Sequence, residues 1–172
     1  VKDGVVTIKI VEGFVNKVSI EGVNETSRLA EYADKIRNAK PLDSATLERY
    51  MLLMEDLPGV SVHAVIRPAA GVPGASDIIL KVDEKPIDAS FSIDNRGTRY
   101  IGPVEFSATA ALNNALGMYE RTQVRLFAAD NTDELKYGQI THEQQLDSEG
   151  TKVVFSAGRT RSNPGYRLRN LQ

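Results

Sequence analysis

The sequence predicts an α+β fold in which two short helices are confined to the first half of the chain and antiparallel strands make up the rest. Before Pro86, segments with a helical period alternate with strand-like segments; after Pro86, every apolar pattern has the two-residue period of a strand. With 41% hydrophobic and 26% charged residues, the chain has the composition of a protein with a folded core.

The first half carries signals in the order β-α-α-β-β. Pro41 ends the first helix because it lacks an amide proton, and Asp43 or Ser44 can cap the second. The expected elements are strands at 5–11 and 14–20, helices at 27–39 and from 44 to about 56, and strands at 60–67 and 77–82 joined by a hairpin loop. One core is expected to contain Leu29, Ile36, Leu47, Met51, Val62, Ile66 and Ile79.

The second half consists of longer strand patterns separated by turn residues. Dyad-alternating strands of about 9 to 11 residues joined by turns are typical of transmembrane β-barrels. A soluble β-sandwich or barrel alternates in the same way. Small residues on the apolar face, such as Ala108, Ala110 and Ala128, favour the membrane interpretation.

Composition and motifs argue against several classes of function. The formal charge of -2 is unlike the basic surface that nucleic-acid binding requires. The chain has no cysteine, His63 and His142 lie in different segments without metal-ligand spacing, and no Gly-x-Ser-x-Gly elbow occurs. We therefore expect a protein that is not an enzyme, does not bind nucleic acid and needs no metal or cofactor.

Four strings of residues occur together in one order. They are LERYMLLM at 47–54, LPGV at 57–60, IDNRGTRYIGP at 93–103 and LNNALG at 112–117. Together they resemble the two-partner secretion transporters, the haemolysin activation/secretion proteins of Gram-negative outer membranes. That family has two periplasmic polypeptide-transport-associated (POTRA) domains followed by a transmembrane β-barrel, and the resemblance covers essentially the whole chain.

The resemblance implies an α+β chain with three parts. Residues 1–12 are expected to be the tail strand of a preceding POTRA domain, and residues 13–85 a POTRA domain with the order β-α-α-β-β. Residues 86–172 are expected to be the first antiparallel strands of an incomplete outer-membrane β-barrel. The POTRA part would lie in the periplasm and the barrel strands in the outer membrane.

The function implied is recognition and secretion of an unfolded exoprotein through an outer-membrane pore. An extended polypeptide can add to an exposed sheet edge, where free amides and carbonyls bind it with little dependence on sequence. In the resembling fold this edge is the strand after the second helix, here 60–67, and the first helix, here 27–39, closes the groove beside it. We expect the exoprotein to contact the backbone of Ser61, His63 and Val65, together with nearby Arg67.

The cluster Arg96-Gly97-Thr98-Arg99-Tyr100 has two interpretations. In the functional one, it is a periplasmic-side turn whose arginines organise the mouth of the pore. In the structural one, it is a β-turn in which Gly97 takes a positive φ and the arginines are solvated.

Two other functions remain open at this point. A barrel-assembly or autotransporter-assembly factor has the same type of module, and a soluble β-rich binding protein would have the same strand periodicity. The partners expected under the secretion hypothesis are the extended exoprotein and outer-membrane lipid. We also expect the isolated strands to self-associate through their unpaired edges.

Overall fold

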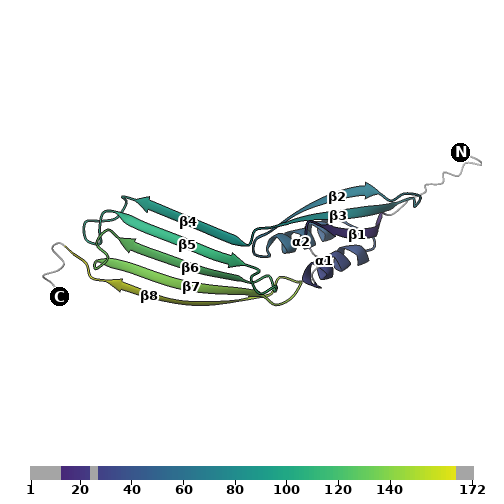
Figure 1. Cartoon of the computed structure of the whole chain (residues 1–172). Helices are drawn as coiled ribbons and strands as arrows, with labels where there is room; N and C mark the ends of the chain where they lie inside the picture. The colour runs from purple at the N-terminus through teal and green to yellow at the C-terminus, as the bar shows by residue number, and fades with distance from the viewer. Residues whose placement is uncertain (1–12, 24–26, 166–172) are drawn as a thin grey trace, which may run out of the picture. The chain divides into compact units, whose positions relative to one another are not determined.

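A computed structural model of the chain describes residues 13–23 and 27–165. Contacts divide it into two compact units (Figure 1). The first, which we call the helical unit, contains both helices and three strands; the second, the sheet unit, contains the strands after Lys85 and the turn 57–59. The strand expected at 5–11 and the proposed tail segment 1–12 lie outside the described residues.

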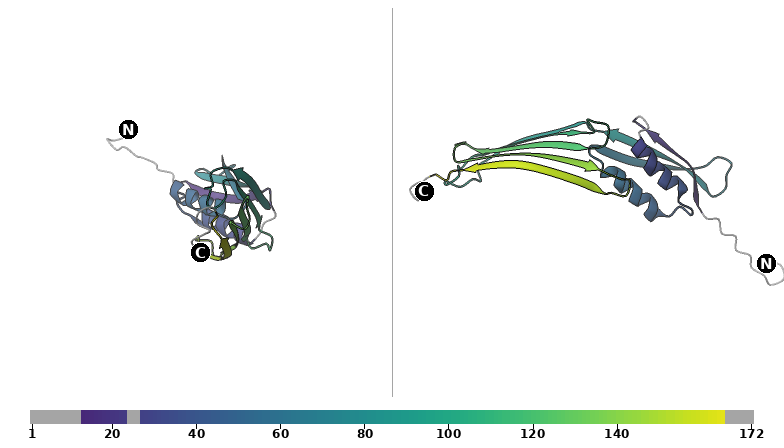
Figure 2. Two further views of the ribbon diagram at one scale, coloured as in Figure 1. Left: turned by 90° about the vertical axis from the view of Figure 1, so that its left-hand side faces the viewer. Right: turned by 90° about the horizontal axis from the view of Figure 1, so that it is seen from below.

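The helical unit has the predicted order β-α-α-β-β. Its elements are β1 (Phe14–Glu21), α1 (Ser27–Asn38), α2 (Ser44–Glu55), β2 (Val60–Pro68) and β3 (Ala75–Glu84). The sheet order is β1-β3-β2, with β1 parallel and β2 antiparallel to β3. The chain must cross over between β1 and the β2–β3 hairpin, and the two helices of this crossover cover one face of the sheet (Figure 2).

The core of the helical unit lies between the helices and this face. Leu29 and Ile36 of α1 are fully buried, as predicted, and so is Val62 of β2. Leu47 and Met51 of α2 are half-buried, and Met54, one turn later, is the fully buried residue of that helix.

Two expected core residues are not in the core. Ile79 lies between Ile78 and Leu80, which are both fully buried, so Ile79 points to the opposite face of β3. An uninterrupted apolar run such as Ile78-Ile79-Leu80 does not reveal which alternate residues face inward. Ile66 is 53% exposed. The 12 residues of α2 extend about 18 Å, whereas the nine residues of β2 extend about 30 Å, so the helix is too short to cover the end of the strand where Ile66 lies.

The sheet unit is an open antiparallel meander. Its strands are β4 (Ile87–Asp94), β5 (Glu105–Asn113), β6 (Arg121–Ala129), β7 (Leu135–Gln145) and β8 (Lys152–Ser162). Each pairs with the next, in the order β4-β5-β6-β7-β8, so β4 and β8 are the edges of the described sheet. We call the end at which β4 begins the base, and the end at which β4 finishes the distal end.

The register segregates apolar from polar side chains on the two faces of this sheet. Directly opposed residues of antiparallel strands share a face, so Ala110, Val124, Ile140 and Ala157 form one row across β5–β8. The same face, which we call the apolar face, carries Phe91 and Phe155, each 67% exposed. The other face is polar; on it, the hydroxyl oxygens of Ser92 and Ser107 lie 2.7 Å apart.

The two helices are short. Each has 12 residues, and neither is long and apolar enough to cross a membrane.

Candidate functional site

The strand predicted to receive a polypeptide, β2, lies at an edge of its sheet. The side chains of Ser61, His63 and Arg67 are exposed and that of Val65 is half-buried, on the face away from the helices. The exoprotein contacts proposed for these four residues stay a prediction, whereas the geometry of the edge can be worked out in detail.

Two hydrogen bonds at the ends of the β2–β3 ladder determine which backbone groups are free. Lys85 N donates to Gly59 O at 2.7 Å, and Ala69 N donates to Ala75 O at 2.9 Å. Antiparallel strands alternate between hydrogen-bonded and non-hydrogen-bonded pairs. Because Gly59 and Ala69 both bond to the β3 side, every second residue between them does the same.

The free backbone groups of β2 therefore belong to the residues between those named from the sequence. Ser61, His63 and Val65 direct their amides and carbonyls toward β3, opposite Asp83, Lys81 and Ile79. The intervening residues direct theirs to the free edge: Val62, Ala64 and Ile66. Sequence alternation indicates which residues share a face, but it carries no information on which of two edges a backbone group faces.

The helix beside this edge also differs from the expectation. α2 packs against β2, whereas α1 packs against β1 and against α2. The reason is the sheet order: β1 and β2 lie at opposite edges, and each helix covers the strand nearest to it along the chain. The groove beside β2 is thus bordered by α2 and not by the segment 27–39.

Asp43 fixes the start of α2. It is the N-cap residue, and its carboxylate accepts hydrogen bonds from the Thr46 backbone amide at 2.7 Å and from the Thr46 hydroxyl at 2.8 Å. The bond from the Thr46 amide, followed by that from its hydroxyl, holds the pKa of Asp43 below its ordinary value of 3.8.

This cap predicts an acid-sensitive helix end. A carboxyl whose pKa is depressed by folding contributes its full stabilisation above the unfolded pKa and loses it as the pH falls through the folded pKa. We expect amides in the first turn of α2 to exchange faster, relative to their intrinsic rates at the same pH, below pH 3.8. Asp43→Asn, which keeps an acceptor but does not titrate, should remove that step; an unchanged profile in this variant would show that another group causes the acceleration.

A second group of polar side chains holds the base of the sheet unit together. The Nδ2 of Asn113 donates to Lys85 O at 2.9 Å and to the Asp88 carboxylate at 3.0 Å. Arg121 donates to the same Asp88 oxygen and to Asn113 Oδ1, each at 3.1 Å. Lys85 Nζ lies 2.6 Å from the other oxygen of Asp88. The network ties the start of β4 to the adjacent ends of β5 and β6.

The turn between β5 and β6 is fixed by a buried carboxylate. Glu120 is 1% exposed, and its two oxygens accept from Leu116 N at 2.7 Å and Met118 N at 3.2 Å. Asn114 closes the same turn by accepting from Tyr119 N at 2.9 Å. These bonds satisfy backbone donors that a tight turn would otherwise leave without partners.

Sequence reasoning missed this network. Lys85 and Asp88 are more than 20 residues away from Asn113 and Arg121, and only the strand register brings them together. The one available signal is the asparagine pair at 113–114, a residue type that favours turns. Among the described residues, no three His, Asp or Glu side chains are grouped as a metal site.

The turn between β4 and β5 lies at the distal end of the sheet, because β4 separates Arg96 from Lys85. Its proposed role at the mouth of the pore stays a prediction. Gly97 does not have a positive φ; Gly102 does, at 106°. Glycine is required at 97 for space, since a Cβ there would lie 2.0 Å from the Gly102 carbonyl oxygen.

No family model matches this chain. The chain is 23% identical over 178 residues to the heme/hemopexin transporter protein HuxB of Haemophilus influenzae (strain 86-028NP), covering 100% of the chain and 31% of HuxB. It is 25% identical over 122 residues to the outer membrane transporter CdiB of Escherichia coli O6:K15:H31 (strain 536 / UPEC), covering 71% of the chain and 21% of CdiB. HuxB and CdiB are two-partner secretion transporters.

The resemblance to the two-partner secretion transporters is therefore confirmed at the level of sequence similarity. The chain spans about a third of the length of the curated relative HuxB. Both relatives are transporters by name.

Solved structures agree with this resemblance at the level of the fold. CdiB from Escherichia coli aligns with a TM-score of 0.57 at 19% identity, over 87% of this chain and 32% of CdiB. BamA from Haemophilus ducreyi lacking POTRA domains 1-3 aligns with a TM-score of 0.55 at 14% identity, over 86% of this chain and 27% of BamA. The predicted fold class, an α+β module of POTRA type followed by antiparallel barrel strands, is confirmed.

Two of the strings that carried the resemblance meet at the base of the sheet unit. Gly59 of LPGV has a φ of 73°, and a Cβ there would lie 2.4 Å from Lys85 O and 2.9 Å from the Asn113 side chain. Asn113 belongs to the string LNNALG. The glycine is therefore required both by its backbone conformation and by the network around Asn113.

We expect Gly59→Ala to lower the free energy of unfolding by more than the strain of a positive φ alone, which costs about 1 kcal/mol. Gly71→Ala is the matched control, since Gly71 has a φ of 76° but open space where a Cβ would be. Chemical denaturation of both variants in detergent solution measures the difference. Equal losses would contradict the steric role assigned to the base network.

Proposed function

We propose that this chain is the POTRA-to-barrel segment of an outer-membrane transporter that secretes an unfolded exoprotein. In this proposal, residues 13–85 are a periplasmic POTRA domain and residues 86–172 are the first strands of the barrel. Residues 1–12 are the tail strand of a preceding POTRA domain. No covalent chemistry and no cofactor are needed for this function.

The observation that carries the proposal is the segregation of the two faces of the sheet unit. Exposed apolar side chains such as Phe91, Leu126 and Phe155 cover one face, while serines, threonines and charged residues make up most of the other, on which Phe127 and Tyr137 form one aromatic pair. A soluble sheet would bury such an apolar face against a second layer. A barrel wall instead turns it toward lipid and turns the polar face toward an aqueous interior.

The helical unit supports the receiving step. Its β2 edge presents the backbone groups of Val62, Ala64 and Ile66, which can pair with any extended chain because every residue except proline supplies the same donor and acceptor. Sequence-independent pairing suits an unfolded substrate. The exposed Ser61, His63 and Arg67 side chains would then flank the added strand and contribute selectivity.

A barrel-assembly function is the second candidate, and the structural similarity to BamA favours it. The sequence matches separate the two, because the relatives aligned over 100% and 71% of this chain are both named as transporters. In cells, loss of a secretion pore should abolish export of one exoprotein, whereas loss of an assembly factor should deplete many unrelated barrels.

Adjacent residues on β6 provide a sharp test of the membrane orientation. Val124 lies in the middle of the apolar face, and Gln123 lies next to it on the polar face. In the full-length gene product, we expect Val124→Lys to reduce the amount of protein recovered in the outer-membrane fraction, because a lipid-facing charge at mid-depth costs about 2–4 kcal/mol. Gln123→Lys adds the same charge and should leave the recovered amount unchanged.

Equal recovery of both variants would overturn the assignment of the apolar face to lipid. Equal loss of both would mean that neither face tolerates charge, as expected for a sheet buried inside a soluble protein. In either case the alternative of a soluble β-rich binding protein would replace the proposal.

A further inference from the structure

The apolar face is not uniformly apolar. Lys136 of β7 and Arg159 and Arg161 of β8 lie on it near the distal end of the sheet. The register places Lys136 directly opposite Arg161, and Arg159 opposite Gly138, one alternate residue further along. All three side chains are exposed, and none forms a hydrogen bond or an ion pair within the part of the chain that the structure describes.

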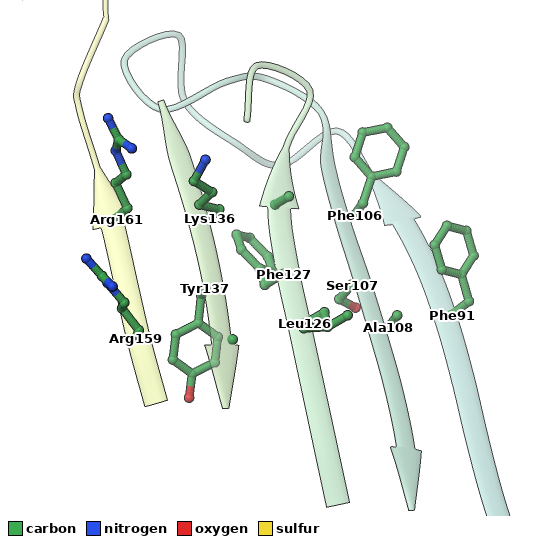
Figure 3. A pocket seen from close by; sticks show the side chains of 12 residues that line it. Phe91, Phe106, Ser107, Ala108, Leu126, Phe127, Lys136, Tyr137, Arg159 and Arg161 are labelled. Carbon is green, nitrogen blue, oxygen red and sulfur yellow. The ribbon is translucent and has the colours of Figure 1, made fainter. Parts of the chain in front are cut away.

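These cations border a pocket of about 660 Å³. Figure 3 shows Arg159, Arg161 and Lys136 on one side of it, and Phe91 and Phe106 on β4 and β5 on the other. Leu126 extends the apolar side. The pocket therefore has one cationic and one hydrophobic wall.

Small residues create the space between the two walls. Two adjacent rows cross the sheet here. In one, Ala108 and Gly138 lie on either side of Leu126; in the other, Ala128 lies between Phe106 and Lys136. A Cβ at Gly138 would contact Leu126 at 3.5 Å, an ordinary van der Waals distance, so the glycine leaves room for a methyl group beside Leu126. The hollow thus results from the small size of Ala108, Ala128 and Gly138.

The nearest acidic group along this part of β7 does not neutralise the cations. Glu134 accepts a hydrogen bond from the Asn131 side chain at 3.1 Å and forms no ion pair with Lys136 or Arg161. Three positive charges without described counterions favour an anion that can accept several hydrogen bonds. A phosphate has that chemistry, and arginine can bind it in a bidentate manner.

We propose that this pocket binds a phosphate-bearing membrane lipid, with the headgroup on Lys136, Arg159 and Arg161 and an acyl chain on the hydrophobic wall. The inference rests on the proposed function, since it requires the apolar face to be in contact with lipid. The position of the pocket at the strand ends agrees with that requirement. Lipid-facing cations are tolerated near the membrane–water interface, where the free-energy cost of each falls to about 0–1 kcal/mol. Long cationic side chains can reach the headgroup level from there.

The test measures lipid affinity of the whole chain in uncharged detergent micelles. Phosphatidic acid and phosphatidylcholine with the same acyl chains are titrated in, and bound lipid is counted by native mass spectrometry. We expect phosphatidic acid to bind more tightly, and Arg159→Gln or Arg161→Gln to weaken it about fivefold each, the effect of one cation near an anionic headgroup. Phosphatidylcholine binding should not change in either variant.

Arg125→Gln is the matched control. Arg125 is an exposed arginine in the same sheet, but it lies on the polar face, opposite Thr109 and Gln139. Its replacement removes the same charge and should leave phosphatidic acid binding unchanged. An equal loss of phosphatidic acid affinity in this variant would show that the overall charge of the chain determines binding, and would overturn the proposal.

Two further outcomes are decisive. Displacement of phosphatidic acid by inorganic phosphate at equal concentration would show a site for a free anion and overturn the assignment to lipid; resistance to it supports the role of the acyl chain. If the Val124→Lys test supports the membrane orientation but the chain shows no preference for phosphatidic acid, only the proposed lipid site is overturned. Failure of the Val124→Lys test itself removes the membrane function, so the two failures are distinguishable.

Discussion

Replacing Ala64 by proline should reduce exoprotein secretion about three- to tenfold while leaving the transporter in the outer membrane at its normal level. The amide of Ala64 points to the free edge of β2, so proline removes one donor for the incoming polypeptide but no bond to β3. One hydrogen bond contributes about 0.5–1.5 kcal/mol, which corresponds to that range. Secreted exoprotein and membrane-fraction transporter are measured in the same culture.

Two neighbouring variants complete this experiment. Ala64→Ser keeps the amide and should secrete normally. Val65→Pro removes a bond to β3 instead, so its effect should appear first as faster amide exchange in the helical unit. Normal secretion by Ala64→Pro would show that the exoprotein is received elsewhere.

The described chain should associate in water when detergent is removed. The open edges of β4 and β8 leave backbone groups without partners, and the apolar face carries large exposed side chains without lipid. Sedimentation velocity in the presence and absence of an uncharged detergent compares the two states. We expect one small species with detergent and larger species without it.

A compact, non-associating monomer in water would contradict this expectation and favour a soluble β-rich protein. The variant Phe91→Ser/Phe155→Ser separates the two contributions. It reduces the apolar surface but keeps both edges, so association that persists in this variant is due to strand pairing, and association that disappears is due to the apolar face.

Periodicity predicted most of the fold because the alternation of apolar and polar residues is clear wherever one face of an element is buried. The order of elements and the apolar face around Val124 both follow from it. Where the alternation is lost, as in Ile78-Ile79-Leu80, the sequence does not distinguish the inward residues. The extent of helix cover is also not encoded locally, and for this reason Ile66 was misplaced.

The candidate sites were less predictable for a different reason. Which amides of β2 are free depends on hydrogen bonds at Gly59 and Ala69, which belong to the ladder and not to any residue type. The network of Asp88, Asn113 and Arg121 and the cationic wall of Lys136, Arg159 and Arg161 depend on strand register. Register couples residues that are distant in sequence, so single-sequence patterns contain no sign of these groupings.

The number of strands in the described sheet restricts how two copies can join. Five antiparallel strands are an odd number, so the first and the last, β4 and β8, run in the same direction. An antiparallel junction that keeps the apolar faces of both copies on one side therefore pairs β4 only with β4, or β8 only with β8, about a two-fold axis. Head-to-tail addition of β4 to β8 would have to be parallel. An isolated chain is thus directed toward symmetric pairs, whereas a strand that follows β8 in the same polypeptide can continue the meander without any such restriction.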